Sequence, residues 1–172
     1  DRRLTPINGQ VGGAAGVTEY LWHGLGFGGS CFPKDVAALR SFGRTVGEQT
    51  RMLDAVLDIN TDQPLRMVAL LEKELSLAGK TVAVLGLAFK PGTDDLRESP
   101  ALPLVAELRK KGAKVLVHDP IAMPHAKKRP EFRDVVFAED WAEALRKSDA
   151  CCLVTAWPEY RNIQPTNFQN LM

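Results

Sequence analysis

The chemistry in this sequence centres on one cysteine, Cys31, which lies within the glycine-rich stretch GLGFGGSCFPKD at residues 24–35. Gly28 and Gly29 allow the backbone to approach a ligand closely. Pro33 favours a helix that starts just after Cys31, and the positive end of a helix favours a thiolate. We therefore predict that Cys31 is a reactive nucleophile. The alternative is a cysteine that packs as a small hydrophobe, and spacing alone does not define the reaction.

A second candidate site is the loop LGLAFKPGTDDLRES at residues 85–99, which follows a buried-strand pattern. Ligands of open parallel sheets bind at the carboxyl ends of the strands, so this loop is well placed. It lacks the G-x-G-x-x-G fingerprint, which argues against a plain dinucleotide site. Lys90 and Arg97 could hold phosphate or carboxylate, with Phe89 beside them. The alternative is a solvated loop whose cations pair with its own acids, Asp94, Asp95 and Glu98.

Other residues of chemical interest favour structural roles. Cys151 and Cys152 lie in an apolar run, which predicts core packing in a strand. The acid in the stretch from His118 to Pro120 could hold a ribose, but without the glycine fingerprint a turn cap is the favoured interpretation. His23 and His125 have no partner set for a metal, and the sequence implies none.

The cysteine loop is predicted to lead into helices. One helix is expected from Pro33 to Gly43, and a long helical region from Val46 to Leu77, which Pro64 kinks or breaks. The apolar stripe of the long region is more than a small domain covers alone. It therefore predicts a homodimer through the long helix.

The period of the apolar residues changes after Ala78-Gly79, where we place a domain boundary. The pattern beyond it alternates strands and helices, which predicts an α/β, Rossmann-like parallel sheet with flanking helices. The expected strands lie at 80–89, 113–120, 134–138 and 150–157, and the expected helices at 99–112 and 140–149. Ser99 and Asp140 are the predicted N-caps of these helices, and Gly112 is the predicted C-terminal glycine of the first. Residues 1–78 are thus predicted as an all-helical dimerisation segment, and residues 79–172 as a Rossmann-like domain.

Composition excludes several classes of function. A net charge of +1 argues against an electrostatic nucleic-acid binder, and no apolar run is long enough to span a membrane. Three cysteines, two of them adjacent, make no disulfide framework, so a reducing, cytoplasmic location is expected. The chain starts without methionine and ends without a cap for its last element, so we expect a portion of a longer protein.

These motifs together resemble the UDP-glucose/GDP-mannose dehydrogenase family. The resemblance rests on GFGGSCFPKD, on Asn60 and Gln63 of the long helix, on VLGLAFKPGTDDLRES and on TAWPEYRNI. It covers nearly the whole chain from Leu21 onward and implies the central dimerisation segment plus the nucleotide-sugar-binding domain, without the NAD-binding domain.

The resemblance implies oxidation of a nucleotide sugar at C6 to a carboxylate, with two hydride transfers to NAD. Cys31 would attack the intermediate aldehyde, and the resulting thiohemiacetal would be oxidised to a thioester and hydrolysed. Asp35 matches the aspartate that orients or activates water. The Cys31 region and Lys34 match positions at the nicotinamide, and Arg97 matches an arginine that reaches NAD.

The resemblance also implies a set of substrate-binding positions, mostly through backbone atoms in the first loop. They are Leu21, Gly24, Gly26, Phe27, Gly28, Phe89, Lys90 and Arg3. Arg3 would reach the neighbouring subunit's substrate, and the chain departs from the family pattern by inserting most of LTPINGQVGGAAGVTE after it.

Several functions stay open. Phe32 in the cysteine motif favours UDP-glucose as the sugar, with GDP-mannose and UDP-N-acetylmannosamine as alternatives. The family's catalytic lysine, asparagine and glutamate have no counterpart in these residues, so the chain alone is expected to be inactive. A non-catalytic nucleotide-sugar-binding and dimerisation module is a second interpretation. A cysteine hydrolase that pairs Cys31 with His118 or His125 is a third.

Overall fold

The computed structural model describes residues 24–172 of the chain. Its elements, in chain order, are α2 (Phe32–Thr45), α3 (Arg51–Glu74), β1 (Thr81–Leu85), α4 (Ala101–Lys110), β2 (Lys114–His118), α5 (Met123–Ala126), the 3-10 helix η1 (Pro130–Phe132), β3 (Val136–Phe137), α6 (Trp141–Arg146), β4 (Ala150–Leu153), α7 (Pro158–Arg161) and α8 (Pro165–Leu171).

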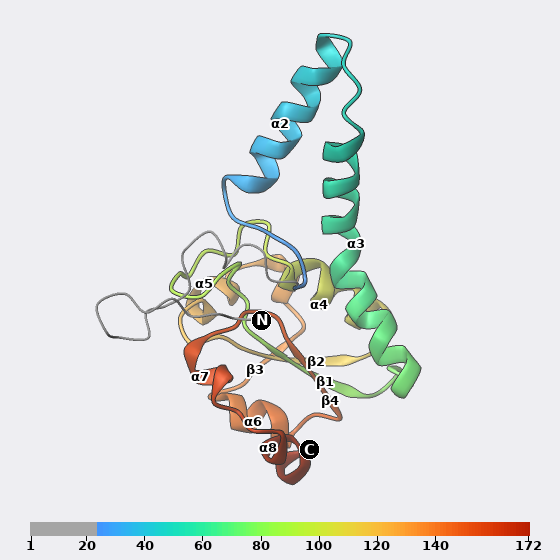
Figure 1. Cartoon of the computed structure of the whole chain (residues 1–172). Coiled ribbons are helices and arrows are strands. Elements are labelled where there is room, and N and C mark those ends of the chain that lie inside the picture. Colours follow the sequence, from blue (N-terminus) through green and yellow to red (C-terminus); the bar gives the residue numbers. More distant parts are fainter. Residues whose placement is uncertain (1–23) are drawn as a thin grey trace, which may run out of the picture.

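A four-stranded parallel sheet with the order β3-β2-β1-β4 forms the lower part of the molecule (Figure 1). Thr81 pairs with Lys114 and Leu85 with His118, so β1 and β2 run in register along their full length. The β1 strand has a neighbour on each side, and residues 82–85 are completely buried. This burial explains its continuous apolar run. The predicted fold class is confirmed.

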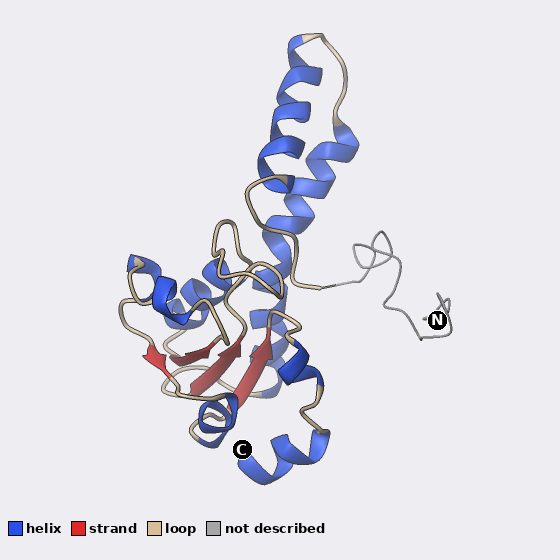
Figure 2. Cartoon of the chain, turned by 90° about the vertical axis from the view of Figure 1, so that its left-hand side faces the viewer, coloured by secondary structure: helices blue, strands red, loops and turns tan. Residues whose placement is uncertain are grey.

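The core lies between the sheet and its helices. The inner side chains of α4 include Leu104 and Leu108, and α6 contributes Leu145; none of the three is exposed. The lower half of α3 packs on α4, and Val68 carries the contact into the core. In Figure 1, α4 lies above the sheet, the lower half of α3 runs down at its right, and α6 and α8 lie below it. Figure 2 shows the strands between these layers and the helical pair that projects from them.

The upper part is a hairpin of α2 and the first half of α3 (Figures 1 and 2). An ion pair of 2.5 Å between Arg44 and Asp54 joins the two helices. No residue of α2 is buried, and within α3 only Pro64 and Val68 are. Because the sheet domain reaches only the lower half of α3, the hairpin leaves large apolar side chains in solvent.

The helix boundaries differ from those predicted. The first helix starts at Phe32, which makes Cys31 its N-cap residue. It also continues through Gly43, where we expected its end, to Thr45. The left-handed glycine that follows a helix is Gly47 instead, with φ of +79°.

The second helix starts at Arg51, so the chain between the two helices turns over residues 46–50. It runs through Pro64 without a break, and its axis changes direction along its length (Figure 1). This agrees with a proline kink and excludes a break at this proline. Two predicted caps of the sheet helices are confirmed: Asp140 accepts a hydrogen bond of 2.6 Å from Glu143 N, and Gly112 has φ of +81°.

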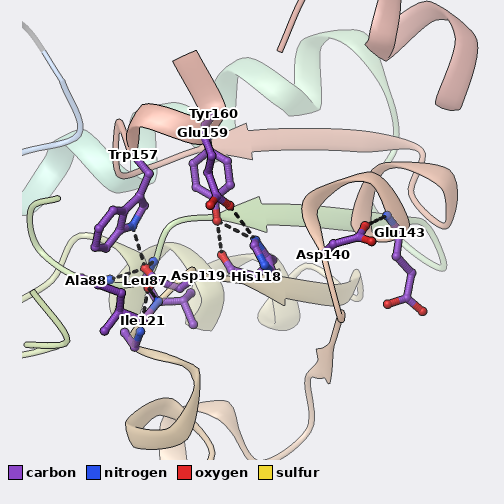
Figure 3. Close-up of polar contacts among 11 residues, drawn as sticks. Leu87, Ala88, His118, Asp119, Ile121, Asp140, Glu143, Trp157, Glu159 and Tyr160 are labelled. Atoms are coloured by element: carbon purple, nitrogen blue, oxygen red, sulfur yellow. Dashed lines mark hydrogen bonds and ion pairs between the residues drawn. The ribbon is translucent and has the colours of Figure 1, made fainter. Parts of the chain in front are cut away.

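The carboxyl edge of the sheet is organised by the buried carboxylate of Asp119, which is 1% exposed. It accepts five hydrogen bonds, four from backbone N–H groups and one from an indole (Figure 3). The donors, at 2.7 to 3.1 Å, follow three different strands: Leu87, Ala88, Ile121, Ala122 and Trp157. The acid that ends the second strand is therefore a turn cap, as favoured from the sequence. It is too enclosed to hold a ribose.

His118, just before this carboxylate, fixes the segment after β4. Its Nδ1 lies 2.7 Å from the hydroxyl of Tyr160, and that hydroxyl lies 3.1 Å from His118 O (Figure 3). Burial lowers the pKa of His118, although the nearby carboxylates of Glu159, Asp119 and Asp140 act in the opposite direction. The imidazole is therefore a neutral, structural group near pH 7.

We expect Asp119→Asn to lower the free energy of unfolding by about 3 kcal/mol or more. The carboxamide would turn an NH2 group toward backbone donors, and each unsatisfied buried donor costs about 1–3 kcal/mol. Urea denaturation measures the change, with the exposed Asp62→Asn on α3 as the matched control. A loss no larger than that of the control would contradict a central role for this carboxylate.

Candidate functional site

The two motifs predicted from the sequence lie side by side in the structure. Gly29 N donates a hydrogen bond of 2.8 Å to Arg97 O, which joins the cysteine loop to the loop after β1. A Cβ atom built on Gly28 would lie 3.0 Å from Phe89 Cβ. Candidate residues more than 60 positions apart therefore form one site above the carboxyl edge of the sheet.

The glycines before Cys31 are required by this contact. A Cβ on Gly28 would lie 2.2 Å from Glu98 O, and a Cβ on Gly29 would lie 2.8 Å from the ring of Phe89. Gly29 also has φ of +87°, which L side chains rarely adopt. The sequence suggested an approach of the backbone to a ligand. In the structure both glycines approach the chain itself, and this contact alone explains them.

Cys31 is exposed at the N-terminus of the 14-residue helix α2. Its backbone oxygen accepts a hydrogen bond of 2.8 Å from Asp35 N, and its Sγ lies 3.6 Å from Ser30 Oγ. The alternative of a cysteine that packs as a small hydrophobe is therefore excluded. Its position suits an anion, because the unpaired N–H groups of a first helical turn carry a partial positive charge.

One cation from each motif lies near Cys31. The pKa of Lys34 is raised mainly by its hydrogen bond to Asp35, and a charge on Cys31 would add to this effect. The pKa of Arg97 is raised mainly by its hydrogen bonds to Asp95, again with a contribution from Cys31. Lys34 and Asp35 are largely exposed, so a bound molecule can reach both.

The start of the second loop is immobilised by side chains from three elements. Leu87 N and Ala88 N donate to Asp119, as described above. The hydroxyl of Ser99 donates to Leu87 O at 2.6 Å, and that of Thr155 donates to Ala88 O at 2.5 Å. All four polar backbone groups of this dipeptide are thus paired, and the position of the next residue, Phe89, is set by buried bonds.

The middle of the second loop is more open. Lys90 Nζ lies 5.4 Å from the centre of the Phe89 ring, and within residues 24–172 it forms no ion pair. Arg97 donates three hydrogen bonds of 2.8 to 3.1 Å to the carboxylate of Asp95, whose pKa is lowered by them. The prediction that loop cations pair with loop acids holds for Arg97, and Lys90 is available to a ligand.

One backbone conformation at the junction is unusual. Glu98 has φ of +51°, a region that non-glycine residues rarely occupy. Its carbonyl is the group that faces Gly28, and the preceding carbonyl accepts the bond from Gly29. Such conformations cluster at functional sites, and this one lies where the two predicted motifs meet.

Several sequence candidates lie elsewhere. Leu21, Arg3 and His23 are outside the described residues. His118 is bound to Tyr160, and His125 lies 3.4 Å from Asp94, so neither forms a catalytic pair with Cys31. The cysteine-hydrolase interpretation therefore has no support.

The prediction for the two adjacent cysteines holds. Cys151 and Cys152 are packed in β4, and burial raises the pKa of each to about 12, so they are inert core thiols. Residues 24–172 contain no cluster of His, Cys, Asp or Glu suited to a metal. None of their helices combines the length and apolar character that crossing a bilayer requires.

Sequence reasoning missed the residues that hold the site together. Asn60 and Gln63, quoted above only for the resemblance, bind the backbone of residues 24–27 from α3. Ser99 was predicted as the N-cap of the helix at 99–112, but α4 starts at Ala101 and its N-cap residue is Pro100. The Ser99 hydroxyl accepts a bond from Ala101 N and donates one to Leu87 O, and the second bond was not foreseen. A buried hydroxyl near a loop is too common a pattern to reveal such a role.

Comparison with known proteins identifies the same two parts. The UDP-binding-domain model of the UDP-glucose/GDP-mannose dehydrogenase family matches residues 83–172, and the central-domain model of that family matches residues 10–62.

Comparison with individual relatives gives the same result as the family models. The chain is 47% identical to the UDP-glucose 6-dehydrogenase AglM of Haloferax volcanii over 83% of its own length and 33% of the relative's. It is 38% identical to the UDP-glucose 6-dehydrogenase TuaD of Bacillus subtilis, and the match covers 90% of this chain and 33% of the relative. The solved structure of a UDP-glucose dehydrogenase from Pyrobaculum islandicum is 44% identical, with a TM-score of 0.78. The match covers 82% of this chain and 33% of that structure. The chain thus spans about a third of the length of these relatives.

We expect Gly28→Ala to lower the free energy of unfolding by about 2 kcal/mol, because overpacking that displaces backbone typically costs about 1–3 kcal/mol. The added methyl would meet a carbonyl oxygen at 2.2 Å, while Gly24→Ala is a matched control with nothing within 4 Å. Chemical denaturation of both variants gives the comparison. Equal stability of the two variants would show that the loops are not in contact as described.

Proposed function

Because the chain belongs to the UDP-glucose/GDP-mannose dehydrogenase family, we propose that it is the cysteine-bearing, nucleotide-sugar-binding part of a NAD-dependent UDP-glucose 6-dehydrogenase. The observation that carries the proposal is the contact between the Cys31 loop and the Phe89–Glu98 loop, where Lys34 and Arg97 line one hollow. The names of the relatives favour UDP-glucose as the substrate.

The proposed role of Cys31 is to hold the aldehyde formed by the first oxidation at C6. The thiolate adds to the aldehyde carbon and gives a thiohemiacetal. Loss of hydride from that carbon gives a thioester, and attack by water releases the carboxylate and restores the thiol. Asp35 is proposed to orient this water. Its present partner, Lys34, is exposed and can exchange the contact for a ligand.

The residues beside the thiol fit part of a dinucleotide. A hollow of about 480 Å³ is lined by Gly29, Ser30, Pro33, Lys34, Arg97 and Glu98. Its two cations suit a phosphate-bearing group. NAD bound here would accept hydride from the sugar carbon in each oxidation. The proposed contribution of this chain is to present Lys34 and Arg97 to the cofactor and to hold Cys31 next to Ser30 at the border of the hollow.

The nucleotide sugar is proposed to bind along the first loop and the start of the second. The positions are Gly24, Gly26, Phe27, Gly28, Phe89 and Lys90, with Leu21 and Arg3 outside the described residues. Residues 1–78 are proposed as the dimerisation segment and residues 79–172 as the nucleotide-sugar domain. The free cysteines suit a reducing compartment such as the cytoplasm.

A second candidate is a non-catalytic module that binds a nucleotide sugar and dimerises. The coverage of about a third of each relative favours this candidate for the 172 residues by themselves. We therefore expect no NADH from the chain alone when it is offered NAD and UDP-glucose.

The test is a hybrid in which this chain replaces the matching part of the Haloferax volcanii relative. UDP-glucose, GDP-mannose and UDP-N-acetylmannosamine are offered in parallel, and NADH and uronate are measured. We expect about two NADH per UDP-glucose, because the covalent capture joins two hydride steps. Cys31→Ser should abolish uronate formation, while Cys151→Ser, in a core strand, should not.

Each other outcome has a definite meaning. Normal uronate production by Cys31→Ser would exclude Cys31 as the nucleophile. Turnover of a different sugar would correct the substrate. No NADH with any sugar, combined with UDP-glucose binding by the chain in calorimetry, would favour the non-catalytic module.

The homodimer is proposed to form through α3, because its upper half leaves Met52 at 80% and Ile59 at 58% exposed. We expect Met52→Glu to shift the chain from dimer to monomer in sedimentation equilibrium, since it places a charge in an apolar interface. Lys128→Glu, on the sheet domain, is the control for added negative charge. A monomeric native chain would refute the dimer.

A further inference from the structure

The side chain of Asn60 binds a peptide of the cysteine loop in the way that a neighbouring strand would. Its Oδ1 accepts a hydrogen bond of 2.6 Å from Phe27 N, and its Nδ2 donates one of 3.1 Å to Phe27 O. A carboxamide is the side chain that offers both an acceptor and donors in this arrangement. The two residues are 33 positions apart, so this pair is a tertiary anchor rather than a local turn.

The packing around Asn60 is close enough to define one position for the loop. Gly26 has φ of +118°, and a Cβ there would lie 2.7 Å from Asn60 Oδ1. Gln63, on the same helix, donates a bond of 3.2 Å to Gly24 O. Residues 24–27 are therefore bound along α3, with glycine at the point of closest approach.

Cys31 follows this anchor by four residues, and a second anchor lies between them. Gly29 N is bound to Arg97 O, and the chain then enters α2. The rings of Phe27 and Phe32, on either side of the cysteine loop, lie 6.0 Å apart. The path from Asn60 to the thiol therefore has little freedom, and a shift of Phe27 would be passed on to Cys31.

We propose that Asn60 is a positioning residue that holds Cys31 at the geometry needed to capture the aldehyde. It acts through the Phe27 peptide and touches no reacting atom. The inference rests on the proposed function for its catalytic consequence and on the two hydrogen bonds of Asn60 for its structural part.

The catalytic test uses the hybrid enzyme with Asn60→Leu and Asn60→Asp. Leucine removes both hydrogen bonds. Aspartate keeps the shape and the acceptor but turns an oxygen toward Phe27 O. The readout is the fraction of turnovers that release aldehyde, caught by a trapping amine, rather than uronate. We expect this fraction to rise at least tenfold with leucine and at least threefold with aspartate.

Asp62→Asn, an exposed substitution two positions along α3, is the matched control and should leave the fraction unchanged. A residue that only stabilises the fold would lower the melting temperature without changing how the aldehyde partitions. An unchanged aldehyde fraction in both Asn60 variants, at a temperature where they are folded, would overturn the proposal.

A second measurement does not depend on catalysis. In the chain itself, Asn60→Leu should speed amide hydrogen exchange of residues 26–31 at least tenfold and leave β1 and β2 unchanged. Native-like exchange of residues 26–31 would overturn the inference. If the native hybrid makes no NADH at all, the proposed function fails, while the exchange result still decides whether Asn60 anchors the loop.

Discussion

Five hydrogen bonds converge on the carboxylate of Asp119, and their donors lie on segments that follow three different strands. A buried carboxylate is tolerated only when its lone pairs are filled, and here backbone N–H groups fill most of them. The consequence reaches beyond the fold. The same carboxylate fixes Leu87 and Ala88, these fix Phe89, and the ring of Phe89 limits the position of Gly29 two residues before Cys31. The placement of an exposed thiol thus depends on a buried acid in another part of the chain.

Much of this architecture follows from local sequence rules. The run of Val and Leu in β1 predicts a strand buried on both faces, and Asp140 and Gly112 predict the ends of helices by their capping chemistry. The first hairpin was harder to predict. Gly43 looks like a helix end, but its missing side chain makes room for Thr50, whose Cγ2 would lie 2.6 Å from a Cβ at Gly43. A tertiary contact explains this glycine, and a single sequence gives no signal that distinguishes the two causes.

The candidate site also combines features that the sequence predicts with features that only tertiary contacts explain. The residue types in the cysteine motif indicated a reactive thiol, and the exposure of Cys31 agrees with that reading. The contact between the Cys31 loop and the Phe89–Glu98 loop could not be predicted from the sequence. Arg97 O and Gly29 N are backbone atoms, and any residue types would supply them. The features that accompany this pairing are two adjacent glycines in the sequence and the left-handed backbone of Glu98 in the structure.

The sheet domain and the hairpin of α2 and α3 differ in how many apolar side chains they expose. The sheet domain needs few exposed apolar groups because α4 and α6 cover its faces, whereas the hairpin exposes Phe42, Met52 and Ile59. Side chains of this kind contribute about 1.5–3 kcal/mol each to stability when they are fully buried. A partner surface that covers them would therefore stabilise the hairpin. The α3 helix carries this exposed face, and it also carries Asn60, which binds the loop before Cys31. A surface that covers α3 would therefore restrain the same helix that positions the thiol, which gives a physical reason for assembly and chemistry to share one element.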